Sequence, residues 1–266
     1  MNYRHGFHAG SAADVFKHAL LAITLERLLQ KPKALFVLDT HAASGLYRLA
    51  PAGEAQDGIA RLWPHRAQWP GLAPYLDVVA RHNATRLRIY PGSPVLASAL
   101  LRPQDRLVAV ESDPQAHAHL VRSLEGPRRQ AFWGDGYQAL KALLPPPERR
   151  ALILIDPPYE RAGERAALLA GLTTACRRFR QGVYLIWYPI KDRREADRLG
   201  AALARFSETR LQAELLTLPP DVHNRLNGSG LMILNPPFGL KDAVGEVLPG
   251  LAHCLTRDGI ARYRLL

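Results

Sequence analysis

The sequence predicts an α/β fold with a mostly parallel central sheet. Short apolar segments alternate with amphipathic segments along the 266 residues, a pattern typical of strands joined by helices. Several apolar segments have no polar face, as expected of strands covered by helices on both sides. Hydrophobic residues make up 47% of the chain and charged residues 22%, which is close to a globular average and argues against a disordered chain or a coiled coil.

Seven segments have the composition of strands, namely Ala34–Asp39, Leu107–Glu111, Gln130–Trp133, Ala151–Asp156, Val183–Tyr188, Leu211–Leu218 and Leu231–Asn235. Helical spacing of apolar residues predicts helices at Ala12–Gln30, Pro114–Leu124, Tyr137–Leu143, Arg161–Arg178, Asp192–Phe206 and Asp242–Leu255. The helix start at Pro114 is well marked, because Asp113 is a good N-cap and proline is favoured at the first helical position.

One connection is much longer than a simple crossover. Roughly 65 residues separate Asp39 from Leu107, whereas most connections are short. The segment 49–89 contains several prolines and short helical stretches. We expect it to form a small inserted helical subdomain within a single domain that spans residues 1–266.

The charge balance favours a polyanionic partner. Lys and Arg total 35 and Asp and Glu total 24, so the formal net charge is +11 and the pI is about 10. A generic basic surface has the same composition, so charge alone does not establish nucleic-acid binding. The clusters Arg177–Arg180 and Lys191–Arg194 are, taken singly, typical of a solvated face.

Other compositional features narrow the class of protein. The two cysteines, Cys176 and Cys254, are too few for a disulfide framework or a zinc site built from cysteine, and we interpret Cys176 as a buried small hydrophobic residue. No segment reaches the ~18 apolar residues of a membrane span, and the first ten residues lack the apolar core of a signal peptide. We therefore expect a cytoplasmic protein.

The strongest chemical signal is the tetrapeptide Asp156-Pro157-Pro158-Tyr159, directly after a buried strand. Ligand sites of open α/β sheets lie at the carboxyl ends of strands. The exocyclic amine of adenine is a poor nucleophile; a carboxylate and the Pro157 carbonyl can each accept one of its N–H groups, and Asp156 can accept the released proton. Prolines place no backbone N–H there, and Tyr159 can stack on a base. The motif therefore indicates an S-adenosylmethionine-dependent amino-methyltransferase, although an ordinary turn would have the same sequence.

A second candidate motif, Asn235-Pro236-Pro237-Phe238, also follows an apolar strand. Chain order separates the two motifs, because the catalytic loop is expected on a strand in the middle of the chain, where Asp156 lies. We interpret Asn235 as a structural turn at the edge of the sheet.

Three strand ends are candidates for the cofactor. The loop Asp39–Gly45 follows the first strand, although it holds only one glycine and Asp39 can equally cap the turn. Glu111 ends the next strand, where an acidic residue typically binds ribose hydroxyls. Asp135-Gly136 follows the third, where a carboxylate can accept a hydrogen bond from an adenine amine.

The N-terminal segment is dense in polar and aromatic residues, with Tyr3, Arg4, His5 and His8 followed by Lys17 and His18. The spacing of His8, His18 and His41 matches no standard zinc signature, and we expect no metal. An arm that contacts phosphates or bases fits the composition, and so does a solvated tail.

Several blocks of the chain, in order, resemble one known family. They are 3–18 (YRHGFHAGSAADVFKH), 38–47 (LDTHAASGLY), 90–94 (YPGSP), 135–146 (DGYQALKALLPP), 149–160 (RRALILIDPPYE) and 230–238 (GLMILNPPF). This is the RlmJ family of bacterial 23S ribosomal RNA adenine-N6 methyltransferases. The resemblance implies a Rossmann-like, S-adenosylmethionine-dependent methyltransferase with a helical insertion after the cofactor loop.

The resemblance also assigns roles to residues. Asp156 corresponds to the catalytic residue, with Pro157 and Tyr159 beside it. The implied cofactor contacts are His18, His41, Ser93, Glu111, Asp135, Gly136 and Asp156. Tyr3 corresponds to the tyrosine that approaches the substrate base, and Lys17 lies next to a contact position. Ala43 departs from the family, which usually has glycine there.

We therefore expect direct methyl transfer to the N6 amine of a flipped-out adenosine in 23S ribosomal RNA, by a monomer without a metal. Three alternatives remain open at this point: a DNA adenine methyltransferase, a glutamine methyltransferase acting on a protein, and a non-catalytic RNA-binding assembly factor. The sequence does not identify the target adenosine.

Overall fold

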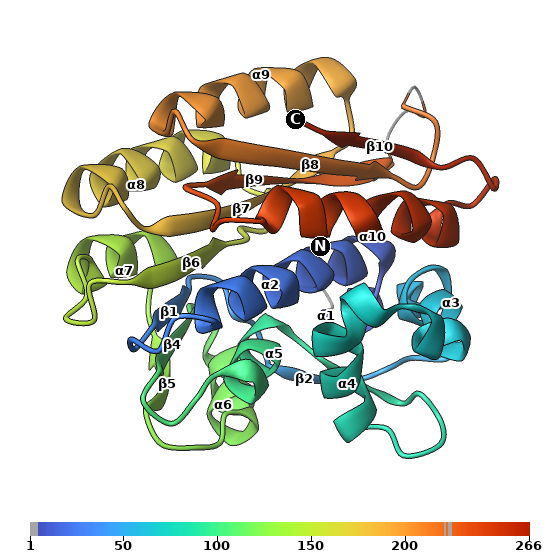
Figure 1. Cartoon of the computed structure of the whole chain (residues 1–266), viewed down its shortest axis with the longest axis horizontal. Helices are drawn as coiled ribbons and strands as arrows, with labels where there is room; N and C mark the ends of the chain where they lie inside the picture. Colours follow the sequence, from blue (N-terminus) through green and yellow to red (C-terminus); the bar gives the residue numbers. More distant parts are fainter. Residues whose placement is uncertain (1–4, 221, 223–224) are drawn as a thin grey trace.

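A computed structural model describes residues 5–220, 222 and 225–266. Within these residues, one sheet has eight strands in the order β10-β8-β9-β7-β6-β1-β4-β5 (Figure 1). The strands are β1 (Phe36–Asp39), β4 (Arg106–Glu111), β5 (Arg129–Trp133), β6 (Ala151–Ile155), β7 (Val183–Ile190), β8 (Arg210–Leu216), β9 (Gly228–Leu234) and β10 (Arg262–Leu265). The strands from β5 to β7 are parallel, whereas β8, β9 and β10 pair antiparallel. The α/β prediction with a mostly parallel sheet is confirmed, and the seven expected strands are present; β10 was not expected.

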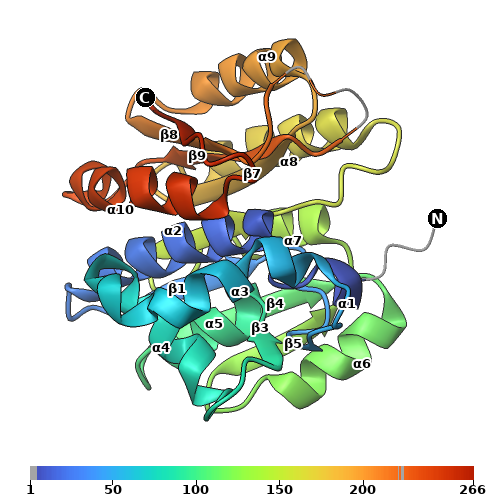
Figure 2. The same cartoon turned by 90° about the vertical axis from the view of Figure 1, so that its right-hand side faces the viewer.

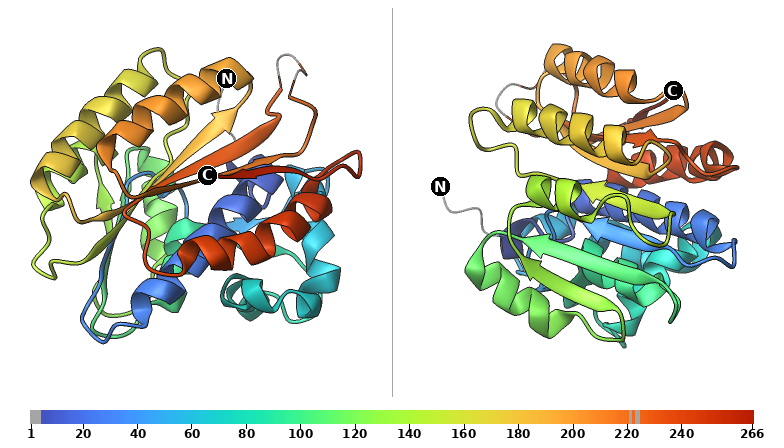
Figure 3. Two further views of the ribbon diagram at one scale, coloured as in Figure 1. Left: turned by 45° about the horizontal axis from the view of Figure 1, so that its top comes forward. Right: turned by 90° about the vertical axis from the view of Figure 1, so that its left-hand side faces the viewer.

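Helices cover both faces of the sheet (Figures 2 and 3). One hydrophobic cluster joins the sheet to α2 (Ala12–Leu29), α4 (Ala73–Arg81), α5 (Ser93–Leu100) and α10 (Leu240–Leu255). A second cluster joins the other face to α7 (Gly136–Leu143), α8 (Glu164–Arg178) and α9 (Arg193–Leu203). The helix α6 (Pro114–Ser123) packs beside β4 and β5. None of the helices in the described ranges is long and apolar enough to cross a membrane.

The strand β6 shows why the apolar segments lack a polar face. All five of its residues are buried. Leu152 and Leu154 belong to the first cluster, and Ile153 and Ile155 belong to the second. Since side chains alternate between the faces of a strand and both faces here are covered, every position is apolar.

The segment that we expected to be an insertion lies between β2 (Leu46–Arg48) and β3 (Ile89–Pro91), which pair antiparallel. It contains α3 (Ile59–Leu62), α4 and three short 3₁₀ helices. These elements contact α2 and α10, and their buried residues join the first hydrophobic cluster. The helix α5, which follows β3, was missing from the expected helices; it begins at Ser93 with Pro94 in its first turn.

The order of the strands creates a topological switch point beside β1. The chain proceeds from β1 to β4 and β5 on one side, and then returns to β6 and β7 on the other side. In open α/β sheets, ligands bind at such a switch point, outside the carboxyl ends of the strands. Asp39 at the end of β1 and Asp156 just after β6 lie at this switch point.

Candidate active site

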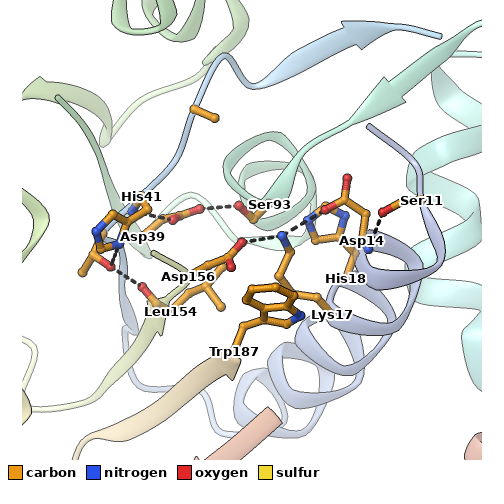
Figure 4. A network of polar contacts seen from close by, with 12 residues as sticks. Ser11, Asp14, Lys17, His18, Asp39, His41, Ser93, Leu154, Asp156 and Trp187 are labelled. Carbon is orange, nitrogen blue, oxygen red and sulfur yellow. Dashed lines mark hydrogen bonds and ion pairs between the residues drawn. The ribbon is translucent and has the colours of Figure 1, made fainter. Parts of the chain in front are cut away.

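The carboxylate of Asp156 is held by a lysine from a distant part of the chain. Lys17 Nζ donates to Asp156 Oδ2 at 2.5 Å and to Asp14 Oδ1 at 3.0 Å (Figure 4). Asp14 Oδ2 in turn accepts the Gly10 N–H at 3.0 Å. Lys17 lies one helical turn after Asp14 on α2, so α2 brings both residues to the end of β6.

This contact determines the charge of Lys17. Burial lowers the pKa of Lys17, but the nearby carboxylates of Asp14 and Asp156 outweigh burial and hold it well above its usual value. Lys17 in turn lowers the pKa of Asp14 despite burial. The group is therefore a buried ammonium between two carboxylates, with an ion pair directly on the predicted catalytic residue.

The end of β1 forms a second polar cluster beside Asp156 (Figure 4). Ser93 Oγ donates to Asp39 Oδ2 at 2.6 Å, and the His41 N–H donates to Asp39 Oδ1 at 3.3 Å. Burial raises the pKa of Asp39 to about 6, and lowers the pKa of His41 to about 4. His41 Nδ1 lies 2.8 Å from Thr40 Oγ1, and the Thr40 hydroxyl donates to the Leu154 carbonyl at 3.0 Å. His41 is thus neutral at physiological pH.

Ala43 adopts the backbone conformation that glycine favours. Its φ is 51°, in the left-handed region. The Ala43 N–H donates to Glu111 Oε2 at 2.8 Å, and the Asp113 N–H donates to Glu111 Oε1 at 2.7 Å. Glu111 therefore ties the loop Asp39–Gly45 to the end of β4, with Ala43 in the left-handed conformation.

Asp135 and Gly136 lie at the carboxyl end of β5. Asp135 Oδ1 accepts the Gln138 N–H at 2.8 Å, so Asp135 caps α7. A Cβ on Gly136 would lie 2.1 Å from the Thr40 carbonyl oxygen. Only glycine lets the start of α7 approach the loop after β1 so closely.

His18 is almost fully buried, and its Nδ1 lies 2.8 Å from the Tyr90 hydroxyl. Burial lowers its pKa to about 3, so it is neutral near pH 7. The Tyr90 hydroxyl lies 3.0 Å from the Tyr75 hydroxyl, which extends the chain of hydrogen bonds into the core. The structure thus gives His18 a structural contact on one ring nitrogen.

The tyrosine of the tetrapeptide Asp156–Tyr159 lies against β7. Tyr159 has a φ of 54°, and its hydroxyl donates to the Trp187 carbonyl at 2.7 Å. The two rings meet edge to face at 5.8 Å. Figure 4 shows Trp187 projecting from β7 toward Lys17 and Asp156. The loop after β6 is therefore anchored to the neighbouring strand.

The second Pro-Pro motif is far from this cluster. β9 is antiparallel to β7, so Asn235 follows β9 at the end of the sheet where β7 begins. Its amide donates to the carbonyls of Arg180 and Gly182, and its Oδ1 accepts from Ser207 Oγ at 2.8 Å. Asn235 is a structural turn, as predicted, but its expected place at the edge of the sheet is wrong, because β9 lies between β7 and β8.

Other predicted features are distributed differently. Tyr3 lies outside the described residues. Among the described residues, no group of three or more His, Cys, Asp or Glu side chains could hold a metal ion. In each of the two basic clusters, one arginine is engaged within the protein. Arg178 donates to the Leu144 carbonyl, and Arg193 pairs with buried Glu214 at 2.7 Å.

The sequence interpretation missed Asp14 and Trp187. Asp14 has a recognisable signal, since its spacing to Lys17 is that of an ion pair on a helix. Trp187 is the penultimate residue of the predicted strand Val183–Tyr188, and no local pattern marks it as a neighbour of Asp156.

Comparisons with known proteins support the family resemblance over nearly the whole chain. A family model described as "Ribosomal RNA large subunit methyltransferase D, RlmJ" matches residues 32–265. The chain is 40% identical to ribosomal RNA large subunit methyltransferase J of Escherichia coli, over 97% of this chain and 95% of that protein. It is 37% identical to the protein of the same name from Haemophilus influenzae, over 99% and 97% of the two chains.

Solved structures agree with the fold. The crystal structure of protein LPL1258 from Legionella pneumophila has a TM-score of 0.92 and 34% identity, over 97% of this chain and 98% of that chain. A probable spermidine synthase from Corynebacterium glutamicum shares the fold at a TM-score of 0.51 and 13% identity, over 88% and 70%. The resemblance inferred from the sequence blocks is confirmed, and the chain belongs to the RlmJ family of S-adenosylmethionine-dependent ribosomal RNA large subunit methyltransferases.

Proposed function

We propose that the protein transfers a methyl group from S-adenosylmethionine to the N6 amine of an adenosine in 23S ribosomal RNA. One observation carries this proposal: the Asp156 carboxylate lies at the switch point of the sheet, followed by two prolines and Tyr159, and is paired with Lys17. The relatives named ribosomal RNA large subunit methyltransferase J support the substrate class.

The residues at the carboxyl ends of β1, β4 and β5 fit a nucleoside cofactor. Glu111 and Asp135 place carboxylates at two neighbouring strand ends, where they can accept hydrogen bonds from ribose hydroxyls and from an adenine amine. We assign the remaining contacts to His18, His41, Ser93, Gly136 and Asp156. S-adenosylmethionine, when bound, supplies an activated methyl group.

Asp156 and Pro157 orient the target amine. The carboxylate accepts one N–H of the amine, and the Pro157 carbonyl accepts the other, so the nitrogen lone pair faces the methyl donor. Lys17 limits the rotation of this carboxylate, because its ammonium donates to Oδ2 at 2.5 Å. Asp156 then receives the proton that leaves the amine. Positioning in a site sheltered from water accounts for most of the rate.

We assign the residues around Asp156 and the basic surface of the protein to RNA binding. We place Tyr3 and Lys17 near the substrate base, and the net charge of +11 favours binding of phosphates. We expect a monomer that acts in the cytoplasm without a metal.

A methyl-transfer assay tests this function. The protein and labelled S-adenosylmethionine are incubated with unmodified 23S transcript or genomic DNA, and the labelled nucleosides are identified. We expect N6-methyladenosine from the transcript and none with the Asp156→Ala variant, whose cofactor binding should fall only modestly. Label in DNA alone would overturn the substrate, and wild-type turnover by Asp156→Ala would overturn the catalytic assignment.

A further inference from the structure

A cavity of about 320 Å³ opens next to the catalytic tetrapeptide. Its walls come from residues 159–165, which lead from β6 into α8, and from residues 189–195, which lead from β7 into α9. Tyr159 lines it and is also the last residue of the tetrapeptide. The cavity lies on the β7 side of Asp156, whereas the strand ends assigned to the cofactor lie on the β1 side. Its volume is at the lower end of the ~300–1,000 Å³ of small-molecule sites.

The carboxylates in the walls of this cavity are engaged with protein partners. Glu164 is buried and accepts the Tyr137 hydroxyl at 2.8 Å. Asp192 accepts the Glu195 N–H and caps α9. Glu195 pairs with Arg165 at 2.7 Å. Arg165 is one of three cationic residues in the cavity walls, so this cation is engaged as well.

The other two cations, Arg161 and Lys191, have exposed side chains that form no hydrogen bond or ion pair with the residues that the structure describes. They belong to the two different segments that form the walls. Glu160 is the neighbouring exposed carboxylate, but it does not line the cavity. The cavity therefore presents two available positive charges, while two of its three acids satisfy backbone or tyrosine donors and the third is in an ion pair.

Apolar surface completes the site. Pro189 and Tyr159 also line the cavity, and the Tyr159 side chain is held in place by its hydrogen bond to the Trp187 carbonyl. A flat aromatic surface beside two cations is the combination that binds a nucleotide, since the base stacks and the phosphate pairs with the charges.

We propose that this cavity binds a nucleotide of the RNA that directly flanks the target adenosine, with its phosphate beside Arg161 and Lys191. The inference rests on the proposed function, which places the target base at Asp156, three residues before Tyr159. When the target base of an RNA occupies that position, the nucleotides next to it must lie along the protein surface beside Asp156. The surface on the β7 side of Asp156 contains the cavity with Arg161 and Lys191. RNA bound there would not overlap the strand ends on the β1 side that we assign to the cofactor.

The chain provides a matched control at the other end of α8. Arg177 and Arg180 are exposed arginines near the carboxyl end of α8, so they lie at the end of the sheet opposite to Asp156. Replacing one of these arginines removes one exposed positive charge, as the cavity substitutions do, but at a residue that does not line the cavity.

The test compares Arg161→Ala, Lys191→Ala and their double variant with Arg180→Ala. Methyl transfer to unmodified 23S transcript is measured as a function of RNA and salt concentration. We expect each cavity substitution to raise the KM for RNA about three- to tenfold. The slope of log kcat/KM against log salt should fall by about 0.7 for each lost phosphate contact. The KM for S-adenosylmethionine should stay unchanged, and Lys191→Arg should restore the wild-type behaviour.

Equilibrium binding of the transcript separates failure of this inference from failure of the proposed function. A double variant whose RNA affinity, KM and salt slope equal those of Arg180→Ala would overturn the cavity as an RNA site, even if the wild type methylates RNA. A wild type that binds the transcript more tightly than the double variant but does not methylate it would overturn the proposed function and leave the cavity assignment supported.

Discussion

Asp156 and Asn235, which both follow an apolar strand and precede two prolines, lie at opposite ends of the strands of one sheet. Ile155 of β6 is level with Ile186 of β7, whereas Leu234 of β9 is level with Tyr184. Asp156 and Asn235 therefore differ by about four residues along β7, or roughly 13 Å. Only Asp156 is at the carboxyl ends of the parallel strands.

This placement predicts different outcomes for the two motifs. Asn235→Ala should lower the free energy of unfolding by about 1–3 kcal/mol, because the carbonyls of Arg180 and Gly182 lose their donor. The turnover number per folded molecule should stay unchanged, whereas Asp156→Ala should abolish it. Urea denaturation and the methyl-transfer assay measure the two quantities. Loss of turnover in a folded Asn235→Ala protein would contradict a purely structural role for the second motif.

Lys17→Met should affect both stability and turnover. The substitution leaves the half-buried carboxylates of Asp14 and Asp156 without their shared cation, which we expect to cost roughly 2 kcal/mol of stability. Turnover should fall at least tenfold, because the Asp156 carboxylate loses the contact that orients it. Asp14→Asn in the Lys17→Met background should recover part of the stability but none of the turnover. Recovery of both would show that Lys17 acts only through folding.

Ala43→Gly should stabilise the protein. Ala43 has a φ of 51°, a conformation that costs a side-chain-bearing residue about 1 kcal/mol and glycine nothing. The melting temperature should rise while cofactor affinity, measured by calorimetry, stays the same. Ala42→Gly is the matched control, since Ala42 is buried and has no positive φ, and it should destabilise. A loss of stability in Ala43→Gly would contradict the explanation from backbone conformation.

Asp39 should make stability depend on pH in a defined direction. Burial raises its pKa to about 6 in the folded protein, against about 3.8 in the unfolded chain, so the folded state binds this proton more tightly. Its contribution therefore favours folding at low pH and is lost as pH rises through 6. Relative to wild type, Asp39→Asn should gain up to about 3 kcal/mol between pH 4 and pH 8. A difference between the two proteins that is constant across this range would contradict the raised pKa.

Removal of residues 1–4 should reduce turnover without reducing stability. The family resemblance places Tyr3 near the substrate base, and these four residues precede α1 (His5–His8). We expect the KM for RNA and kcat to change while the melting temperature and cofactor affinity do not. Tyr3→Ala should reproduce the effect of the truncation. An unchanged rate on RNA would show that this segment is a tail without a role in the reaction.

Local features of the sequence determined a large part of this description. Continuous apolar segments predicted the buried strands, because strands covered on both faces have no polar side. The predicted cap at Asp113 depends on a bond to a backbone group three residues away. The tetrapeptide at Asp156 and the blocks shared with the RlmJ family likewise need no knowledge of the fold. β10 was missed, because none of its four residues is buried and it pairs with a strand from a distant part of the chain.

Tertiary structure alone decided the relations between distant residues. Lys17 and Asp156 are 139 positions apart, and no local pattern predicts that α2 brings them together. Chain order had already distinguished the two Pro-Pro motifs, but only the antiparallel direction of β9 places Asn235 at the opposite end of the sheet from Asp156, inside the sheet rather than at its edge. The Ala43 N–H likewise bonds to Glu111, which lies on another strand 68 positions away. The physical reason is the same in each case. Sequence patterns reflect interactions over a few residues, whereas the order and direction of the strands depend on the packing of the whole core and bring residues from distant parts of the chain into contact.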